Sequence, residues 1–157
     1  MHIGFDGQSH EWEIVCNKHI ADDLLDIFKE LYDAAYPIEK IRLVDEYNAD
    51  DQASMEDNNT SCFNFRFISG TSKISNHGYG LAIDINPLYN PYVKTSSDGT
   101  VHIEPATALE YVDRSQEFSY KIDEKYLAYQ VFTAHGFEWG GSWNSVKDYQ
   151  HFEKSFQ

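Results

Sequence analysis

The clearest hydrophobic pattern along the chain occupies residues 18–34. Apolar side chains recur there every three or four positions: Ile20, Leu24, Ile27, Phe28 and Leu31. Residues at this spacing share one face of an α-helix, so the segment predicts an amphipathic helix. Asn17 is a suitable N-cap, and Pro37 lies just past the expected end, where a proline stops a helix.

A two-residue alternation marks two further segments. LAIDIN, residues 81–86, alternates three aliphatic side chains with a second set that includes Asp84. FNFRFIS, residues 63–69, alternates three phenylalanines with a second set that includes Arg66. Successive residues of a β-strand point to opposite faces, so both segments predict strands with one apolar face.

Weaker patterns complete the expected fold. They predict a strand at 41–44, an exposed polar loop at 48–61 with room for one helical turn, a turn-rich loop at 70–80, a tight turn at 98–99, helices at 105–112 and 124–135, and turns with a short strand from 137 onward. Strands and helices do not alternate regularly. The pattern therefore favours an α+β fold, with helices on one side of a small antiparallel sheet, in a single domain spanning residues 1–157.

Composition supports a packed domain and excludes some partners. Hydrophobic residues make up 41% of the chain and aromatic residues 15%, which is enough for a core and argues against disorder. The formal charge of −14, without any basic run, argues against nucleic-acid binding and against docking on anionic lipid. The first residues, MHIGFDGQSHEWEIV, have no basic segment and no long apolar stretch, so neither a signal peptide nor a membrane span is expected.

Two of the seven histidines stand in unusual surroundings. His77 is followed by Gly78 and Gly80, which allow the backbone to turn sharply and to approach another segment. Asp84 projects from a predicted strand whose other face is aliphatic, and a buried carboxylate needs a partner. His151 follows a Gly-Gly turn and two tryptophans. Two imidazoles and one carboxylate are a set that a catalytic zinc site uses, with a fourth position left for water.

The remaining histidines and the cysteines give no comparable signal. His135 ends a predicted helix, where the helix dipole favours a cation and a capping role. Four others lie in polar or uninformative surroundings: His2, His10, His19 and His102. Cys16 and Cys62 are not spaced as zinc ligands, and both a disulfide and two free thiols stay open. Spacing alone also leaves open that the histidines of interest make ordinary hydrogen bonds.

Two blocks of sequence carry a resemblance that favours a metal site over ordinary hydrogen bonds for these histidines. The first is the pattern S-x-H-x-x-G-x-A-x-D, which begins at Ser75 and ends at Asp84. The second is WGGSW at 139–143, followed by DYQHF at 148–152. In this order they resemble the LAS-type (M15-like) zinc peptidases, which include bacterial D-Ala-D-Ala carboxypeptidases, D,D-dipeptidases and L-alanyl-D-glutamate endopeptidases. The resemblance runs from about residue 41 to residue 156.

The resemblance implies one bound zinc ion and one catalytic acid. His77, Asp84 and His151 correspond to the three zinc ligands, and Asp148 corresponds to the acidic residue that takes and returns the proton. Because residues three apart face opposite sides of a strand, the chain must turn between Asp148 and His151 for both to reach the site.

The resemblance also implies two substrate contacts and shows two departures. Arg66 matches an arginine that binds and polarises the substrate carbonyl, and Ser75 matches the signature serine, which contacts substrate or supports the ligands. Ser142 stands where related endopeptidases usually carry Asp. Gln150 stands where a proline often precedes the last histidine.

Three functions follow as expectations from the resemblance. The favoured one is hydrolysis of an amide bond in peptidoglycan stem peptides by a D-alanyl-D-alanine carboxypeptidase, and an endolysin-like L-alanyl-D-glutamate endopeptidase is the alternative. A non-catalytic zinc-bearing module is the third, because the hedgehog signalling domain shares this architecture, although such a module has no need of Asp148. The expected location is extracytoplasmic, at the cell envelope or secreted, with a phage-encoded lysin made in the cytoplasm as the alternative.

Overall fold

The computed structural model describes residues 1–156, which form three α-helices, four 3-10 segments (η) and ten short strands. The helical segments are α1 Lys18–Asp33, η1 Val44–Tyr47, α2 Asp51–Glu56, η2 Asn76–Tyr79, η3 Leu109–Tyr111, α3 Leu127–Ala134 and η4 Gly140–Ser142. The strands are β1 His2–Ile3, β2 Ser9–His10, β3 Lys40–Ile41, β4 Asn59–Thr60, β5 Ala82–Asp84, β6 Tyr92–Thr95, β7 Val101–Glu104, β8 Glu138–Trp139, β9 Lys147–Asp148 and β10 His151–Glu153. None of the helices in this described part is long and apolar enough to cross a membrane.

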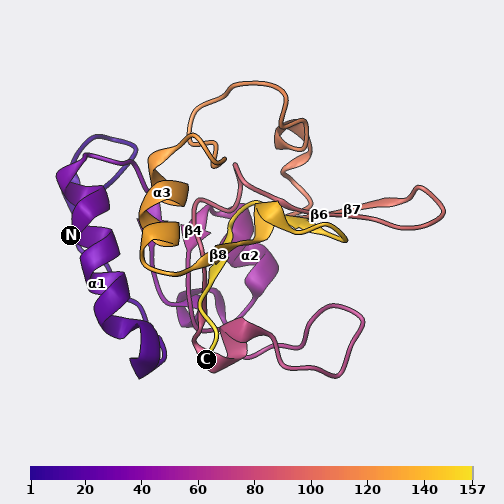
Figure 1. Ribbon diagram of the computed structural model, residues 1–157, viewed down its shortest axis with the longest axis horizontal. Coiled ribbons are helices and arrows are strands. Elements are labelled where there is room, and N and C mark those ends of the chain that lie inside the picture. The colour runs from indigo at the N-terminus through magenta and orange to yellow at the C-terminus, as the bar shows by residue number, and fades with distance from the viewer. Residues whose placement is uncertain (157) are drawn as a thin grey trace.

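The strands pair into four small sheets. Two are three-stranded and antiparallel, with the orders β5-β10-β8 and β7-β6-β9. The β1–β2 pair is antiparallel, whereas β3 and β4 pair in parallel. Helices α1 and α3 lie together on one side of the molecule, and the β6–β7 hairpin projects from the other side (Figure 1). The α+β prediction is confirmed, with the antiparallel pairing divided among several small sheets.

The hydrophobic core joins α1 and α3 to the β5-β10-β8 sheet. The five periodic side chains of α1 are each at most 2% exposed, so the helix predicted at 18–34 packs by its expected face. Asn17 caps this helix as predicted, because its side chain accepts a hydrogen bond from the backbone N of His19 at 2.9 Å. Phe132 of α3 stacks on Phe152 of β10, with ring centroids 4.3 Å apart. Helix and sheet therefore share one interior.

The helical turn allowed in segment 48–61 forms as α2, but the segment is less exposed than its polar sequence predicted. It forms α2 and β4, and residues 58–61 are buried. Asn59 explains the difference, because its side-chain amide bonds the backbone N and O of Arg42 at 2.9 and 3.0 Å. A buried amide that makes its hydrogen bonds is well tolerated, and here the partner lies far away in the sequence.

Three other predicted elements change in extent. The strand expected at 41–44 ends at Ile41. The α-helix expected at 105–112 is wrong, since only η3 forms there; Leu109 is 70% exposed, and the segment has no continuous buried face. The helix expected at 124–135 begins at Leu127, and Gly136 follows it with a left-handed φ of 84°, as a C-terminal cap requires.

Residues 63–69 are extended without forming a regular strand, and a β-bridge links Phe67 to Ile74. The predicted alternation holds over residues 63–67 and ends at Ile68, which is 47% exposed, and its orientation relative to solvent is unexpected. The phenylalanines at 63, 65 and 67 are 44%, 62% and 53% exposed, whereas Asn64 is only 7% exposed. The aromatic face thus points outward, and the polar face points toward the interior of the molecule.

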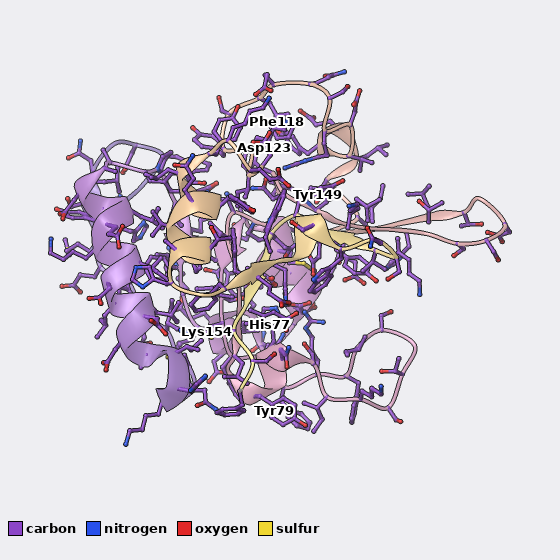
Figure 2. All side chains as sticks on the ribbon, viewed as in Figure 1. His77, Tyr79, Phe118, Asp123, Tyr149 and Lys154 are labelled. Atoms are coloured by element: carbon purple, nitrogen blue, oxygen red, sulfur yellow. The ribbon has the colours of Figure 1, made fainter. Side chains whose placement is uncertain are left out.

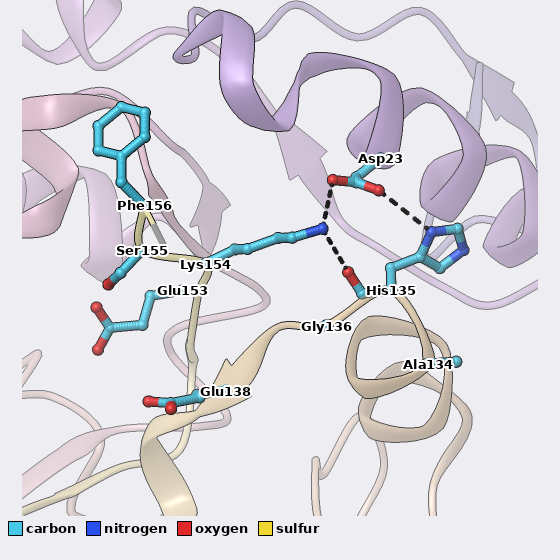
Figure 3. A pocket seen from close by; sticks show the side chains of 9 residues that line it. All are labelled: Asp23, Ala134, His135, Gly136, Glu138, Glu153, Lys154, Ser155 and Phe156. Atoms are coloured by element: carbon cyan, nitrogen blue, oxygen red, sulfur yellow. Dashed lines mark hydrogen bonds and ion pairs between the residues drawn. The ribbon is translucent and has the colours of Figure 1, made fainter.

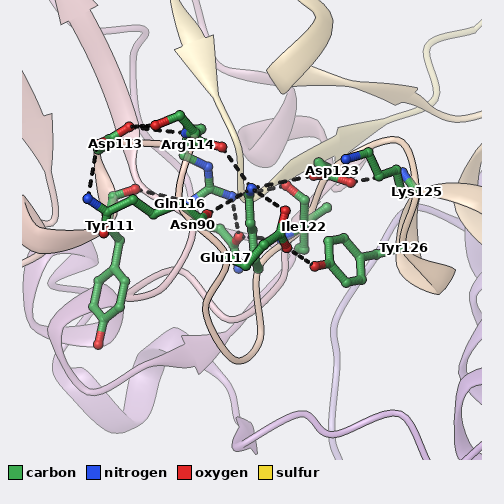
Figure 4. Close-up of polar contacts among 12 residues, drawn as sticks. Asn90, Tyr111, Asp113, Arg114, Gln116, Glu117, Ile122, Asp123, Lys125 and Tyr126 are labelled. Carbon is green, nitrogen blue, oxygen red and sulfur yellow. Dashed lines mark hydrogen bonds and ion pairs between the residues drawn. The ribbon is translucent and has the colours of Figure 1, made fainter.

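The lobe that follows β7 is held mainly by hydrogen bonds between side chains and its backbone, with Arg114 at their centre (Figure 4). Arg114 donates to the carbonyl oxygens of Tyr89, Tyr111 and Ile122 and to Oδ1 of Asn90, at 2.8–3.1 Å. Burial lowers the pKa of Arg114 to about 10. The planar, five-donor geometry of arginine is what allows a single side chain to satisfy four acceptors.

Replacing Arg114 with methionine is expected to destabilise the protein by about 3 kcal/mol, because buried acceptors lose their donor. Lysine at this position should restore only part of the loss, since an ammonium cannot reproduce the planar fork. Urea unfolding of both variants measures the effect, with Lys125→Met, an exposed neighbour, as control. A methionine variant as stable as this control would contradict the assignment.

Candidate metal centre

His77 is held in place by its own loop. Ser75 caps η2, and its Oγ accepts a hydrogen bond from the backbone N of His77 at 3.2 Å. Gly80 ends η2 with a left-handed φ of 67°, and a Cβ there would lie 2.6 Å from Asn17 N, so glycine is required. The His77 Nδ1 donates to the carbonyl oxygen of Cys62 at 2.7 Å. Because a carbonyl only accepts, this bond fixes the tautomer and leaves Nε2 with a free lone pair.

Asp84 and His151 are brought together by strand pairing. Strand β5 carries Asp84 with the alternation predicted for residues 81–86, and β10 begins at His151. The two residues are register partners in the antiparallel β5–β10 pair, so their side chains leave the same face side by side. Ile85 N donates to Gln150 O at 2.9 Å and fixes this register.

The three side chains form a compact donor set. His77 Nε2 lies 3.1 Å from Asp84 Oδ2 and 3.2 Å from His151 Nδ1, and His151 Nδ1 lies 3.3 Å from Asp84 Oδ1. Ligands at zinc distances of about 2.0–2.1 Å in a tetrahedron are separated by roughly 3.3 Å. All three residues are at most 6% exposed. They form a cluster that could hold a metal ion, and the spacing of their donor atoms fits one.

Unpartnered atoms at the cluster support the same interpretation. Within the described residues 1–156, Asp84 Oδ1 and Asp148 Oδ1 are buried and accept no hydrogen bond. Such atoms are costly unless something compensates them, and a cation beside these carboxylates would do so. His151 Nε2, the ring nitrogen outside the donor set, makes no hydrogen bond within residues 1–156, and Glu153 Oε1 lies 3.6 Å from it.

The charged groups of the cluster shift one another's pKa values strongly. Burial opposes ionisation of Asp84, but the charges and hydrogen bonds of the two histidines outweigh it and hold the pKa of this carboxyl far below its usual range. Burial likewise opposes the charged form of His151, yet Asp84, Glu153 and Asp148 raise the pKa of its imidazole to about 10. The metal-free site is therefore built to hold positive charge beside a permanent carboxylate.

Asp148 lies next to the cluster without joining the donor set. It sits in β9, and the chain turns at residues 149–150 before β10, which confirms the turn expected between Asp148 and His151. Its Oδ2 is 3.7 Å from His151 Nδ1. Burial, reinforced by the charge of Asp84, raises the pKa of the Asp148 carboxyl to about 7. A bound divalent cation would lower this pKa again by neutralising the local negative charge.

A cleft of about 390 Å³ opens over these residues, and it is lined by His77, His151 and Asp148 among others. Two projecting arms flank it, the β6–β7 hairpin and the loop before η2, and His77 lies near their base (Figures 1 and 2). The hairpin side contributes Tyr92, Lys94 and Glu104, and the loop side contributes Ser69, Thr71 and Ile74 among others. Trp143 and Val146 add apolar surface. The cleft is thus wide enough for a short peptide and has both polar and apolar lining.

Arg66 and Ser75, predicted as substrate contacts, both line this cleft. The Arg66 Nε lies 3.4 Å from Asp51 Oδ2 and makes no hydrogen bond within the described residues 1–156. Asp51 comes from α2, in the segment whose burial the sequence did not predict. Ser75 is buried, and its contact to the His77 backbone gives it a supporting position beside the cluster.

Several cleft residues were not found from the sequence. Tyr92, Lys94 and Glu104 reach the site through strand pairing, and the only sequence signal for that hairpin was the turn at 98–99. The departures at Ser142 and Gln150 lie outside the cleft lining; Ser142 is exposed, and Gln150 is buried with its Nε2 on Glu104 O at 3.3 Å. The two cysteines are free thiols.

A second cavity, of about 580 Å³, lies among α1, the end of α3 and the segment that follows β10 (Figure 3). Lys154 Nζ forms an ion pair with Asp23 Oδ2 and donates a hydrogen bond to His135 O, both at 2.9 Å. His135 Nε2 bonds Glu30 Oε1 at 2.9 Å. These contacts tie the end of α3 to α1. His135 occupies the predicted C-cap position of α3, while its side chain contacts Asp23 and Glu30 of α1, and these contacts give the cavity a structural explanation.

Comparison with known proteins supports one family. No solved structure matches the chain. The family model described as D-alanyl-D-alanine carboxypeptidase matches residues 69–154, more than half of the chain, and this span contains His77, Asp84, Asp148 and His151. The signature blocks, the paired strands and the clustered donors all fall inside the matched region. The chain therefore belongs to the D-alanyl-D-alanine carboxypeptidase family of M15 peptidases.

Proposed function

We propose that this single domain is a zinc-dependent D-alanyl-D-alanine carboxypeptidase that acts on peptidoglycan stem peptides. The observation that carries the proposal is the buried cluster of His77, Asp84 and His151 at the base of a peptide-sized cleft, with Asp148 beside it. The family membership supports a peptidase of the cell-wall type. The protein would then act outside the cytoplasm or, if phage-encoded, as a lysin on the wall.

His77 Nε2, His151 Nδ1 and the Asp84 carboxylate would hold the ion. Bound zinc would lower the pKa of a coordinated water from about 15.7 toward ~7, which supplies a nucleophile near neutral pH. Imidazole and carboxylate without thiolate suit zinc, and the fixed tautomer of His77 presents the correct nitrogen.

Asp148 would act as general base and then as general acid. Its free Oδ1 accepts the proton of the attacking water as the water oxygen bonds to the scissile carbonyl carbon. Asp148 then passes this proton to the leaving nitrogen as the C–N bond breaks. Arg66, oriented by Asp51, would donate to the oxygen on which negative charge develops.

The test combines metal analysis with product identification. Purified protein should contain about one zinc per chain, lose hydrolysis on chelation and regain it when zinc is added. With muropeptides, mass spectrometry should detect release of single D-Ala. Release of peptides cut after L-Ala would instead establish the endopeptidase, and zinc binding without any product from cell-wall substrates would favour the non-catalytic module.

A close backbone contact at Gly140 should matter for this chemistry. A Cβ at this position would lie 2.5 Å from Asp148 O and 3.2 Å from the His151 Cβ. Gly140→Ala must therefore displace the turn that carries both residues, and displacements near 1 Å can cost about 100-fold in rate. We expect a similar loss in kcat/KM together with weaker zinc binding, measured by competition with a chromogenic chelator. Unchanged values for both would show that the turn adapts without moving either side chain.

A further inference from the structure

One wall of the cleft is the β7-β6-β9 sheet, and its register orders the side chains on it. Tyr92 of β6 pairs with Asp148 of β9 on one side and with Glu104 of β7 on the other. Two positions along β6, Lys94 pairs with His102. Since alternate residues share a face, Tyr92 and Lys94 both point into the cleft, and both line it. On this face of the sheet, Lys94 therefore lies one row beyond the row formed by Glu104, Tyr92 and Asp148.

Lys94 is a cation of the cleft without an ionic partner. Arg66, the other cationic residue of the lining, faces Asp51 at 3.4 Å. Glu104, an acidic residue of the same hairpin, contacts His102 at 2.9 Å. Lys94 makes no ion pair with any residue in the described range 1–156, although the protein carries a net charge of −14. Lys94 is exposed at the cleft lining, and a free ammonium there, in so acidic a protein, favours an anionic group on the ligand.

The spacing along the wall suggests which anion this is. Two residues of a strand span about 6.8 Å, so the Lys94 backbone lies about that far from the row that holds Asp148. One peptide residue spans about 3.6 Å, and the four-carbon stem of lysine can swing back toward it. A substrate with one residue after the scissile bond would end between the two rows. A longer leaving peptide would place a neutral amide there and continue past Lys94.

We propose that Lys94 binds the terminal carboxylate of the substrate, one residue beyond the scissile bond, and so makes the enzyme a carboxypeptidase. The inference rests on the proposed peptidase function and assigns its specificity. It differs from the roles of Arg66 and Asp148, because Lys94 contacts a group that does not react. Its removal should therefore act on substrate binding much more than on the chemical step.

The experiment compares N-acetyl-L-Lys-D-Ala-D-Ala as free acid and as C-terminal amide. The wild-type zinc enzyme should cleave the acid with a kcat/KM about tenfold or more above that of the amide, as one charge-assisted hydrogen bond allows. Lys94→Met should raise KM for the acid about tenfold and leave its kcat nearly unchanged. The kcat/KM for the amide should also stay nearly unchanged, so the preference for the acid over the amide should be lost. Lys94→Arg should retain it. Lys73→Met, which removes an exposed charge outside the cleft lining, controls for the general loss of positive charge.

Binding of the same peptides to the zinc-free protein, measured by calorimetry, tests the Lys94 assignment separately from the proposed peptidase function. Tighter binding of the acid that Lys94→Met abolishes supports the Lys94 assignment even if no hydrolysis is found, in which case the proposed function fails alone. Hydrolysis in which Lys94→Met keeps the wild-type ratio of acid to amide overturns the Lys94 assignment and leaves the peptidase proposal standing.

Discussion

Replacement of His77 by alanine is expected to abolish zinc binding and to lower kcat/KM by about a thousandfold or more. A bound metal contributes several kcal/mol of transition-state stabilisation, and each 1.36 kcal/mol is tenfold in rate. Alanine removes Nε2, which lies 3.1 Å from Asp84 Oδ2 and 3.2 Å from His151 Nδ1, and it leaves the Cys62 carbonyl without the hydrogen bond from Nδ1. Two remaining donors are too few for a site that uses three protein ligands.

The measurement is zinc content after dialysis, together with turnover on D-Ala-D-Ala peptides. His10→Ala is the matched control, because His10 is exposed and pairs with Asp6 on the surface. Circular dichroism would check that both variants fold. A His77→Ala protein that keeps one tightly bound zinc and wild-type turnover would exclude the proposed ligand set.

Asp148→Asn is expected to separate metal binding from chemistry. The amide fills the same space but cannot accept the proton of the attacking water, so kcat should fall by about 10²–10⁴, the usual contribution of general acid–base catalysis. Zinc should stay bound, because Asp148 Oδ2 is 3.7 Å from His151 Nδ1 and Asp148 lies outside the donor set. Substrate KM should change little.

Single-turnover rates and zinc stoichiometry on the same preparation test this expectation. Asp26→Asn, on the exposed side of α1, provides the control for the loss of one negative charge. Loss of zinc from Asp148→Asn would make Asp148 a ligand rather than a base, and unimpaired turnover would remove it from the mechanism altogether.

The sequence predicted the parts of the site whose signals are local. The alternation of residues 81–86 placed Asp84 on the polar face of a strand, and the two motif blocks brought His77, His151 and Asp148 into one hypothesis. Asn17 and Gly136 marked helix ends through cap chemistry that involves only neighbouring residues. For the two caps, the residue and its physical partner are close in sequence.

The parts that could not be predicted depend on distant partners. Asn59 is buried because Arg42 offers its backbone, and the polar composition of 48–61 gave no sign of this. The phenylalanines at 63–69 show that alternation identifies two faces without saying which one meets solvent. Lys94 reaches the cleft only through the register of β6 with β7 and β9, which no local pattern specifies.

The pairing of Asp84 with His151 across β5 and β10 would make metal binding depend on strand alignment. Side chains alternate with a period of two, so a slip of one residue would turn His151 to the opposite face and separate it from Asp84. An ion that binds only the aligned form stabilises that form by mass action. Zinc availability would then govern which alignment the sheet adopts during folding, as well as whether the finished enzyme is active.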